Sequence, residues 1–71
     1  MTPRQLRDKW NLTNYQLACS LGKTEQTVKS YMFDPKAKGF RNTPLSTRIL
    51  CAKLDKEWQH EGTPNIIFLT A

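Results

Sequence analysis

Signals that begin and end helices recur at short intervals in the first half of this 71-residue chain, and they restrict its fold more than any other feature. Thr2 and Thr13 are each followed three positions later by a glutamine, which is the pattern of a capping box at a helix N-terminus. Thr24 is a third N-cap residue, and Gly22 before it suits the end of a helix because glycine tolerates a positive φ. The chain is therefore expected to form short helices at about residues 3–10, 14–21 and 25–33.

A longer fourth helix is expected at about residues 44–61, beginning at Thr43-Pro44 much as the first helix begins at Thr2-Pro3. Its large apolar residues recur at spacings of three and four, which is the period of a helix: Leu45, Ile49, Leu50, Leu54 and Trp58. Gly62 ends this helix. A chain this short needs most of its large apolar residues in the core.

These elements predict an all-α fold, a small four-helix domain over residues 1–62 that contains a helix-turn-helix. The polar and basic segment 34–43 is expected to be a loop, because Asp34 precedes a proline and is thereby kept out of helical geometry. Residues 63–71 form an apolar C-terminal tail that is too short to span a bilayer. We expect this tail to be extended and to pack on the domain or on a partner.

The composition excludes several classes of function. The two cysteines, Cys19 and Cys51, and the one histidine, His60, lack the spacing of a zinc site, so we expect no metal and no cofactor. No nucleophile–base set, glycine-rich phosphate loop or convincing carboxylate pair is present, so we expect neither an enzyme nor a small-molecule substrate. Because no run has the length of a signal peptide or a membrane span, we expect a cytoplasmic protein with reduced thiols and no membrane partner.

The charge of the chain is unevenly distributed along it. The net charge is +5 and the pI is about 9.6, which favours an anionic partner such as nucleic acid. Residues 23–48 hold six basic and two acidic side chains, a net +4, whereas residues 49–71 sum to −1. The positive excess therefore falls on the third helix and on the loop that follows it.

Residues 14–33 have the pattern of two short helices that cross at a tight turn. Ala18 is small where the second helix must approach closely, and Gly22 permits the positive φ that the turn requires. Apolar residues from both helices are expected to meet at the crossing: Leu17, Leu21, Val28 and Tyr31. The outward positions of the second helix are all polar or charged: Thr24, Glu25, Gln26, Lys29 and Ser30. Such a face is suited to hydrogen bonds with base edges in the major groove of DNA.

This stretch resembles the helix-turn-helix of the lambda-repressor-like (Xre/Cro-type) family of DNA-binding regulators. The resemblance rests on Leu17-Ala18, Leu21-Gly22, the Thr24 cap, Val28 and Tyr31. The sequence departs from the family pattern at Lys23, where an apolar residue is usual in the turn. A weaker resemblance extends over about residues 2–61 and includes the segment 42–46 that leads into the last helix.

The resemblance implies a small prokaryotic or phage transcriptional regulator that binds double-stranded DNA and is nucleoid-associated. The second helix of the motif would enter the major groove, while the first crosses the sugar-phosphate backbone. Gln26 and Lys29 are then the best base readers, and Thr24, Glu25 and Ser30 come next. Contacts with the DNA backbone are expected from residues on both sides of that helix: Asn14, Tyr15, Gln16, Lys23, Lys36, Lys38 and Arg41.

Several alternatives stay open at this point. Glu25 could accept from cytosine or only interact with the helix dipole, and Tyr15 could be an ordinary half-buried surface aromatic. The motif could serve in a protein–protein interaction module, such as an antitoxin or adaptor subunit, with Ile66–Leu69 as its apolar patch. RNA binding is a third alternative. A homodimer through Trp58 and Ile66–Leu69 would suit a two-fold DNA site.

Overall fold

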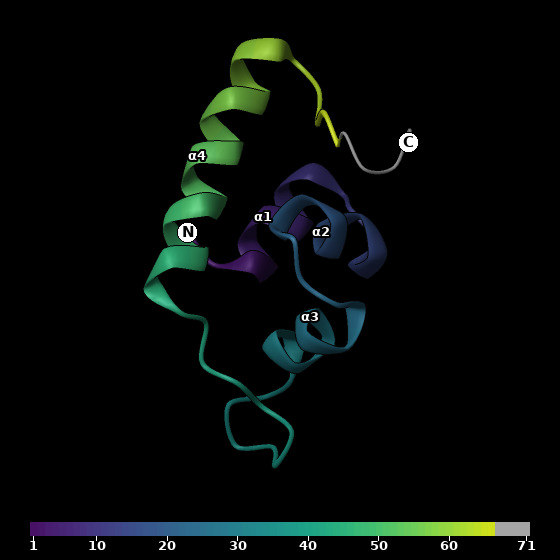
Figure 1. Ribbon diagram of the computed structural model, residues 1–71, viewed down its shortest axis with the longest axis vertical. Helices are drawn as coiled ribbons and strands as arrows, with labels where there is room; N and C mark the ends of the chain where they lie inside the picture. Colours follow the sequence, from purple (N-terminus) through teal and green to yellow (C-terminus); the bar gives the residue numbers. More distant parts are fainter. Residues whose placement is uncertain (67–71) are drawn as a thin grey trace.

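The computed structural model describes residues 1–66 and is helical, with no strand in that range. Three helices of eight residues each are followed by one of 17 residues: α1 (Pro3–Trp10), α2 (Asn14–Leu21), α3 (Glu25–Met32) and α4 (Leu45–Glu61). Figure 1 shows α4 running along one side of the three short helices, with the long α3–α4 loop at one end of the domain. The predicted all-α four-helix fold is confirmed.

The predicted capping boxes are present at the first two helices. The Thr2 Oγ1 accepts from the Gln5 N–H at 3.2 Å, and the Gln5 Oε1 accepts from the Thr2 N–H at 2.9 Å. Thr13 and Gln16 make the same reciprocal pair at 3.1 and 2.9 Å. These bonds satisfy backbone N–H groups that have no partner inside the helix. The starts of α1 and α2 can therefore be predicted from a threonine and a glutamine three positions apart.

Two predicted helix ends differ from the structure by one residue. α3 ends at Met32, because the backbone of Phe33 is already extended at φ −67° and ψ 156°. α4 begins at Leu45, with Pro44 at the N-cap position and no side-chain cap, so Thr43 does not play the role that Thr2 plays at α1. A proline can neither donate a backbone hydrogen bond nor cap through its side chain, but the Pro44 carbonyl accepts from the Arg48 N–H at 3.1 Å.

The core is formed by residues from all four helices. Its fully or almost fully buried apolar members are Leu6, Leu17, Ala18, Leu21, Val28, Cys51 and Trp58. Three of the five apolar residues expected along α4 face the core, because Trp58 is buried and Leu50 and Leu54 pack against it. The other two do not, since Leu45 is 67% exposed and Ile49 is 48% exposed. The buried positions of α4 are Thr47, Cys51, Asp55 and Trp58. α4 packs against α1 and α2, and the side of α4 that meets them carries polar as well as apolar residues.

A buried carboxylate joins α4 to α1. Asp55 is only 9% exposed, and its two oxygens accept from Trp10 Nε1 at 2.9 Å, Lys9 Nζ at 3.0 Å and Gln59 Nε2 at 2.7 Å. Burial acts to raise the pKa of Asp55, but these donors and the positive charge of Lys9 outweigh it and lower the pKa. The Trp10 ring also meets the Trp58 ring edge to face, with centroids 5.8 Å apart.

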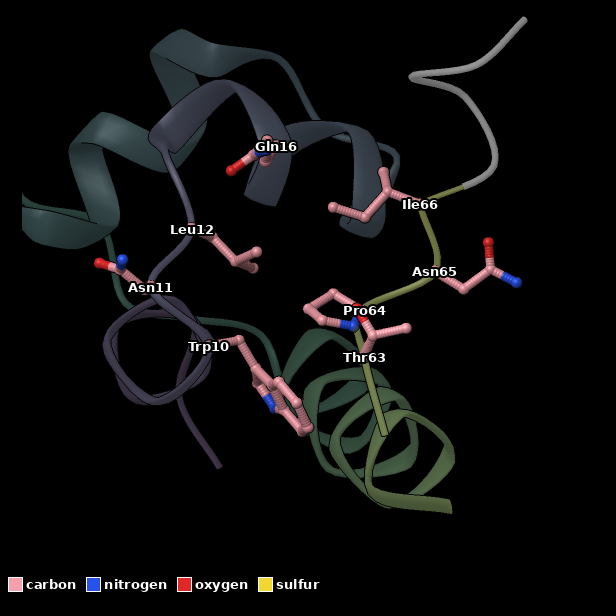
Figure 2. Close-up of a pocket in the computed structure, with 8 residues that line it drawn as sticks. All are labelled: Trp10, Asn11, Leu12, Gln16, Thr63, Pro64, Asn65 and Ile66. Atoms are coloured by element: carbon pink, nitrogen blue, oxygen red, sulfur yellow. The ribbon is translucent and has the colours of Figure 1, made fainter. Parts of the chain in front are cut away.

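The described part of the C-terminal segment folds back from α4 toward the α1–α2 connection. Figure 2 shows Pro64 and Ile66 facing Trp10 and Leu12 across a cavity of about 390 Å³. Ile66 packs against the core, so the tail contacts the domain at this residue. The remaining tail positions, including Ile67, Phe68 and Leu69 of the expected apolar patch, lie outside the described residues. No helix within residues 1–66 has both the length and the apolar character needed to cross a membrane.

Candidate nucleic-acid interface

α2 and α3 pack against each other across a tight turn, as the helix-turn-helix pattern predicts. Gly22 has φ 66° and ψ 31°, the left-handed conformation, and both its N–H and that of Lys23 donate to the Ala18 carbonyl. Thr24 then restarts the chain as the N-cap of α3. The Lys23 side chain is exposed, so the turn closes without the apolar residue that is usual at this position.

The polar face of α3 points away from the core. Val28 is fully buried and Tyr31 is 9% exposed, which fixes the helix by its opposite side. Of the five predicted base readers, three are exposed with no strong internal partner: Glu25, Gln26 and Lys29. The ammonium of Lys29 lies 3.9 Å from the Glu25 carboxylate, a long surface pair that costs little to separate.

The other two predicted base readers are partly occupied within α3. The Thr24 Oγ1 accepts from the Thr27 N–H at 3.2 Å and lies 3.0 Å from the Thr27 hydroxyl. Ser30 is half-buried, and its hydroxyl donates to the Gln26 carbonyl at 3.1 Å. Gln26 and Lys29 therefore remain the best placed to reach a base edge, and Thr24 serves first as a helix cap.

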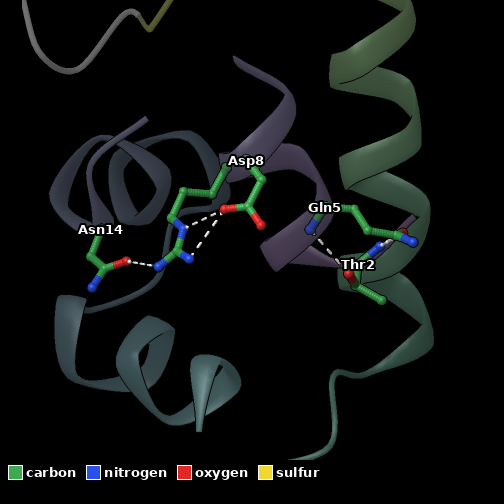
Figure 3. Close-up of polar contacts among 5 residues, drawn as sticks. Thr2, Gln5, Asp8 and Asn14 are labelled. Carbon is green, nitrogen blue, oxygen red and sulfur yellow. Dashed lines mark hydrogen bonds and ion pairs between the residues drawn. The ribbon is translucent and has the colours of Figure 1, made fainter. Parts of the chain in front are cut away.

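Polar side chains gather at the N-terminus of α2. Asn14 is half-buried, and Figure 3 shows its amide oxygen turned toward a guanidinium group, that of Arg7, whose Nη1 donates to it at 3.1 Å. Arg7 also pairs with Asp8 at 3.1 Å. An amide nitrogen is a donor, so the Asn14 Nδ2 is the group that a phosphate contact would use. Sequence reasoning missed Arg7, which acts here across the α1–α2 connection.

The neighbouring residues of α2 are placed differently from one another. Tyr15 is 55% exposed, and a hydrogen bond with Cys19 is the main cause that raises the pKa of the Tyr15 hydroxyl above its ordinary value. Gln16 is half-buried, its Oε1 accepts from the Thr13 N–H in the capping box, and its side chain lines the cavity of Figure 2.

The α3–α4 loop places its basic side chains in solvent. Lys36, Lys38 and Arg41 are all exposed. The loop is nevertheless held to the end of α3, because the Arg41 N–H donates to the Ser30 carbonyl at 3.3 Å. The structure therefore brings the predicted backbone contacts of this loop next to the last turn of α3.

Other chemistry has little support within residues 1–66. The cavity is lined by no titratable side chain, and no cluster of three histidine, cysteine or acidic residues that could hold a metal ion occurs in this part of the chain. Burial raises the pKa of the Cys51 thiol to about 11, which makes it a poor nucleophile.

Comparison of the chain with protein-family models, curated proteins and solved structures gives no match.

Proposed function

We propose that this protein binds double-stranded DNA in a sequence-specific manner, with α3 in the major groove, as a small transcriptional regulator. The observation that carries the proposal is the two-sided character of α3. Its inner side is anchored by the buried Val28 and Tyr31, and its outer side offers Glu25, Gln26 and Lys29 to solvent. A helix held in this way can present amide and ammonium groups to base edges without first becoming ordered.

The flanks of α3 supply groups suited to the DNA backbone. Asn14 and Tyr15 lie at the start of α2, and the exposed Lys36, Lys38 and Arg41 lie in the loop after α3. The two segments come before and after the reading helix in the chain, which matches a helix in the groove with phosphates on both sides. A cytoplasmic, nucleoid-associated location follows from this proposal.

Selection from random duplexes tests the proposal most directly. Binding by α3 predicts a defined base preference, and Gln26→Ala should relax that preference at one base pair by about 1–3 kcal/mol, or roughly five- to 150-fold. The other positions of the selected site should stay unchanged. A wild-type chain that shows no salt-dependent retention of any duplex would refute DNA binding.

Salt dependence separates backbone contacts from base contacts. Lys38→Ala should weaken binding to every duplex and should reduce the slope of log K against log salt by about 0.9, the value for one phosphate contact. Lys56→Ala is the matched control, because it removes the same charge from an exposed position of α4, outside the proposed interface. Equal losses in the two variants would indicate a general charge effect and would argue against a role for the loop.

A protein–protein interaction module, such as an antitoxin or adaptor subunit, is the second candidate. The observation that favours it is the exposure of Leu45 and Ile49, one turn apart on α4. An interface there predicts that Ile49→Lys prevents association with a partner or a second copy. Equal, monomeric masses of wild type and variant in sedimentation would exclude a homodimer through this face.

A homodimer through Trp58 has little support, because this residue is 1% exposed and packs on Trp10 of the same chain. Of the tail positions proposed for the same contact, Ile66 is half-buried on its own domain and the others lie outside the described residues. Sedimentation of the chain with and without residues 63–71 tests the tail, since an unchanged mass would exclude it.

A further inference from the structure

The aromatic ring of Phe33 lies directly over the backbone of Gly39. A Cβ added to Gly39 would stand 2.7 Å from Phe33 Cδ2 and closer still to Cε2, so any larger residue at this position would have to push the ring aside. The φ of Gly39 is outside the left-handed region, so its backbone would accept other residues, and the close approach of the Phe33 ring is the feature that a side chain here would disturb. Phe33 is 45% exposed and stands apart from the core cluster, so this contact belongs to the loop.

The rest of the loop is closed by short-range hydrogen bonds. The Asp34 carboxylate accepts from the Lys36 N–H at 2.9 Å, and the Asp34 carbonyl accepts from the Ala37 N–H at 2.8 Å. Beyond Gly39, the Arg41 N–H reaches the Ser30 carbonyl at 3.3 Å. The chain therefore turns back on itself and returns to α3, and the Phe33 ring lies against Gly39, two residues before Arg41.

We propose that Phe33 is a positioning residue whose seat on Gly39 holds the basic loop beside α3 and so presents Lys36 and Lys38 to the DNA backbone. This inference rests on the proposed function. Ordering a flexible loop at the moment of binding costs conformational entropy, and a loop already held in place avoids that cost. The expected effect is on affinity for all duplexes, because phosphate contacts carry no base preference.

The first test uses the free protein and needs no DNA. Trypsin cleaves after Lys36 and Lys38, and mass spectrometry can follow these cuts separately from cleavage after Lys53 inside α4, which reports unfolding of the helix. Gly39→Ala and Phe33→Ala should both speed cleavage in the loop about tenfold. Each substitution should restore the conformational freedom of about one backbone residue and so open the loop more often. Cleavage after Lys53 should not change, because neither residue belongs to the core.

A double variant and a conservative variant identify the contact itself. Once Phe33→Ala has removed the ring, Gly39→Ala has nothing to displace, so the double variant should be cleaved no faster than Phe33→Ala alone. Phe33→Tyr keeps the ring and should match wild type. Two results would refute the proposal that the contact of Phe33 with Gly39 holds the loop. One is loop cleavage at the wild-type rate in both single variants, and the other is additive effects in the double variant.

The second test measures binding to a random-sequence duplex and to the selected site. Both single variants should bind every duplex about three- to tenfold more weakly, with a smaller salt slope and an unchanged base preference. If the loop is cleaved faster but the affinity for DNA and the salt slope stay at their wild-type values, Phe33 does not position the lysines for DNA, and the proposal of DNA binding still stands. A wild-type chain that binds no duplex would refute the proposed function and this role together, and the cleavage rates would still decide whether Phe33 holds the loop.

Discussion

Removing the buried Asp55 carboxylate should destabilise the domain more than the loss of any other single charged side chain. In Asp55→Ala, the half-buried indole N–H of Trp10 loses its acceptor, which costs about 1–3 kcal/mol for a donor left without a partner. Lys9 is 45% exposed and Gln59 is exposed, so both return to water and each accounts for at most about 1 kcal/mol. The expected loss is therefore about 1–5 kcal/mol, set against the roughly 4–10 kcal/mol of total stability that a chain of this size has.

Urea unfolding followed by tryptophan fluorescence measures this loss directly. The chain has two tryptophans, and both lie at the α1–α4 contact, so their emission reports the separation of the two helices. Asp55→Asn keeps an acceptor for Trp10 and should lose about half as much stability as Asp55→Ala. Glu57→Ala removes an exposed carboxylate from the same helix and should stay within about 0.5 kcal/mol of wild type. A loss below that value in Asp55→Ala would refute the assigned role of the carboxylate.

Three further outcomes are expected. Because the fold lowers the pKa of Asp55 below its unfolded value of about 3.9, the folded state binds fewer protons, so the melting temperature should fall as pH drops below about 4, and less steeply in Asp55→Asn. The Cys51 thiol is fully buried with a pKa of about 11, so at pH 8 a thiol reagent should modify Cys19 quickly and Cys51 only on unfolding, as mass spectrometry can show. Gly22→Ala should cost about 1 kcal/mol in urea unfolding because its φ is 66°, although the new Cβ meets nothing, whereas Asn11→Gly at φ 55° should be neutral or stabilising. Equal effects at these two positions would contradict the backbone argument.

The helix-turn-helix could be predicted from the sequence because its determinants are local. A capping box joins residues three apart, and a left-handed turn needs one glycine at the right position, as at Gly22. The polar face of α3 follows from the same periodicity, since Val28 and Tyr31 define the inner side and leave Gln26 and Lys29 outside. Whether this face binds DNA stays a prediction until a duplex is tested.

The parts of the candidate site that sequence reasoning missed depend on contacts between distant or irregular segments. Arg7 reaches Asn14 across the connection between α1 and α2, in which Asn11 has the left-handed conformation. The contact of Phe33 with Gly39 forms only when the loop turns back on itself, and no periodic pattern in the sequence predicts it. Loops are set by a few specific contacts, so their form does not follow from composition.

In α4, the local sequence pattern predicts the helix but not which of its faces is buried. Its apolar spacing was enough to predict a long helix ending at Gly62, but Leu45 and Ile49 face solvent while Asp55 is buried. Every helix has several faces that an apolar residue can occupy, and the neighbours that pack against it select one of them. Here α4 packs on α1 and α2 with the face that carries Asp55. A carboxylate can be buried there because Lys9, Trp10 and Gln59 donate hydrogen bonds to it. The starts of α1, α2 and α3 and the polar face of α3 thus follow from residues a few positions apart, whereas the inward side of α4 and the place of the basic loop depend on partners that only folding brings together.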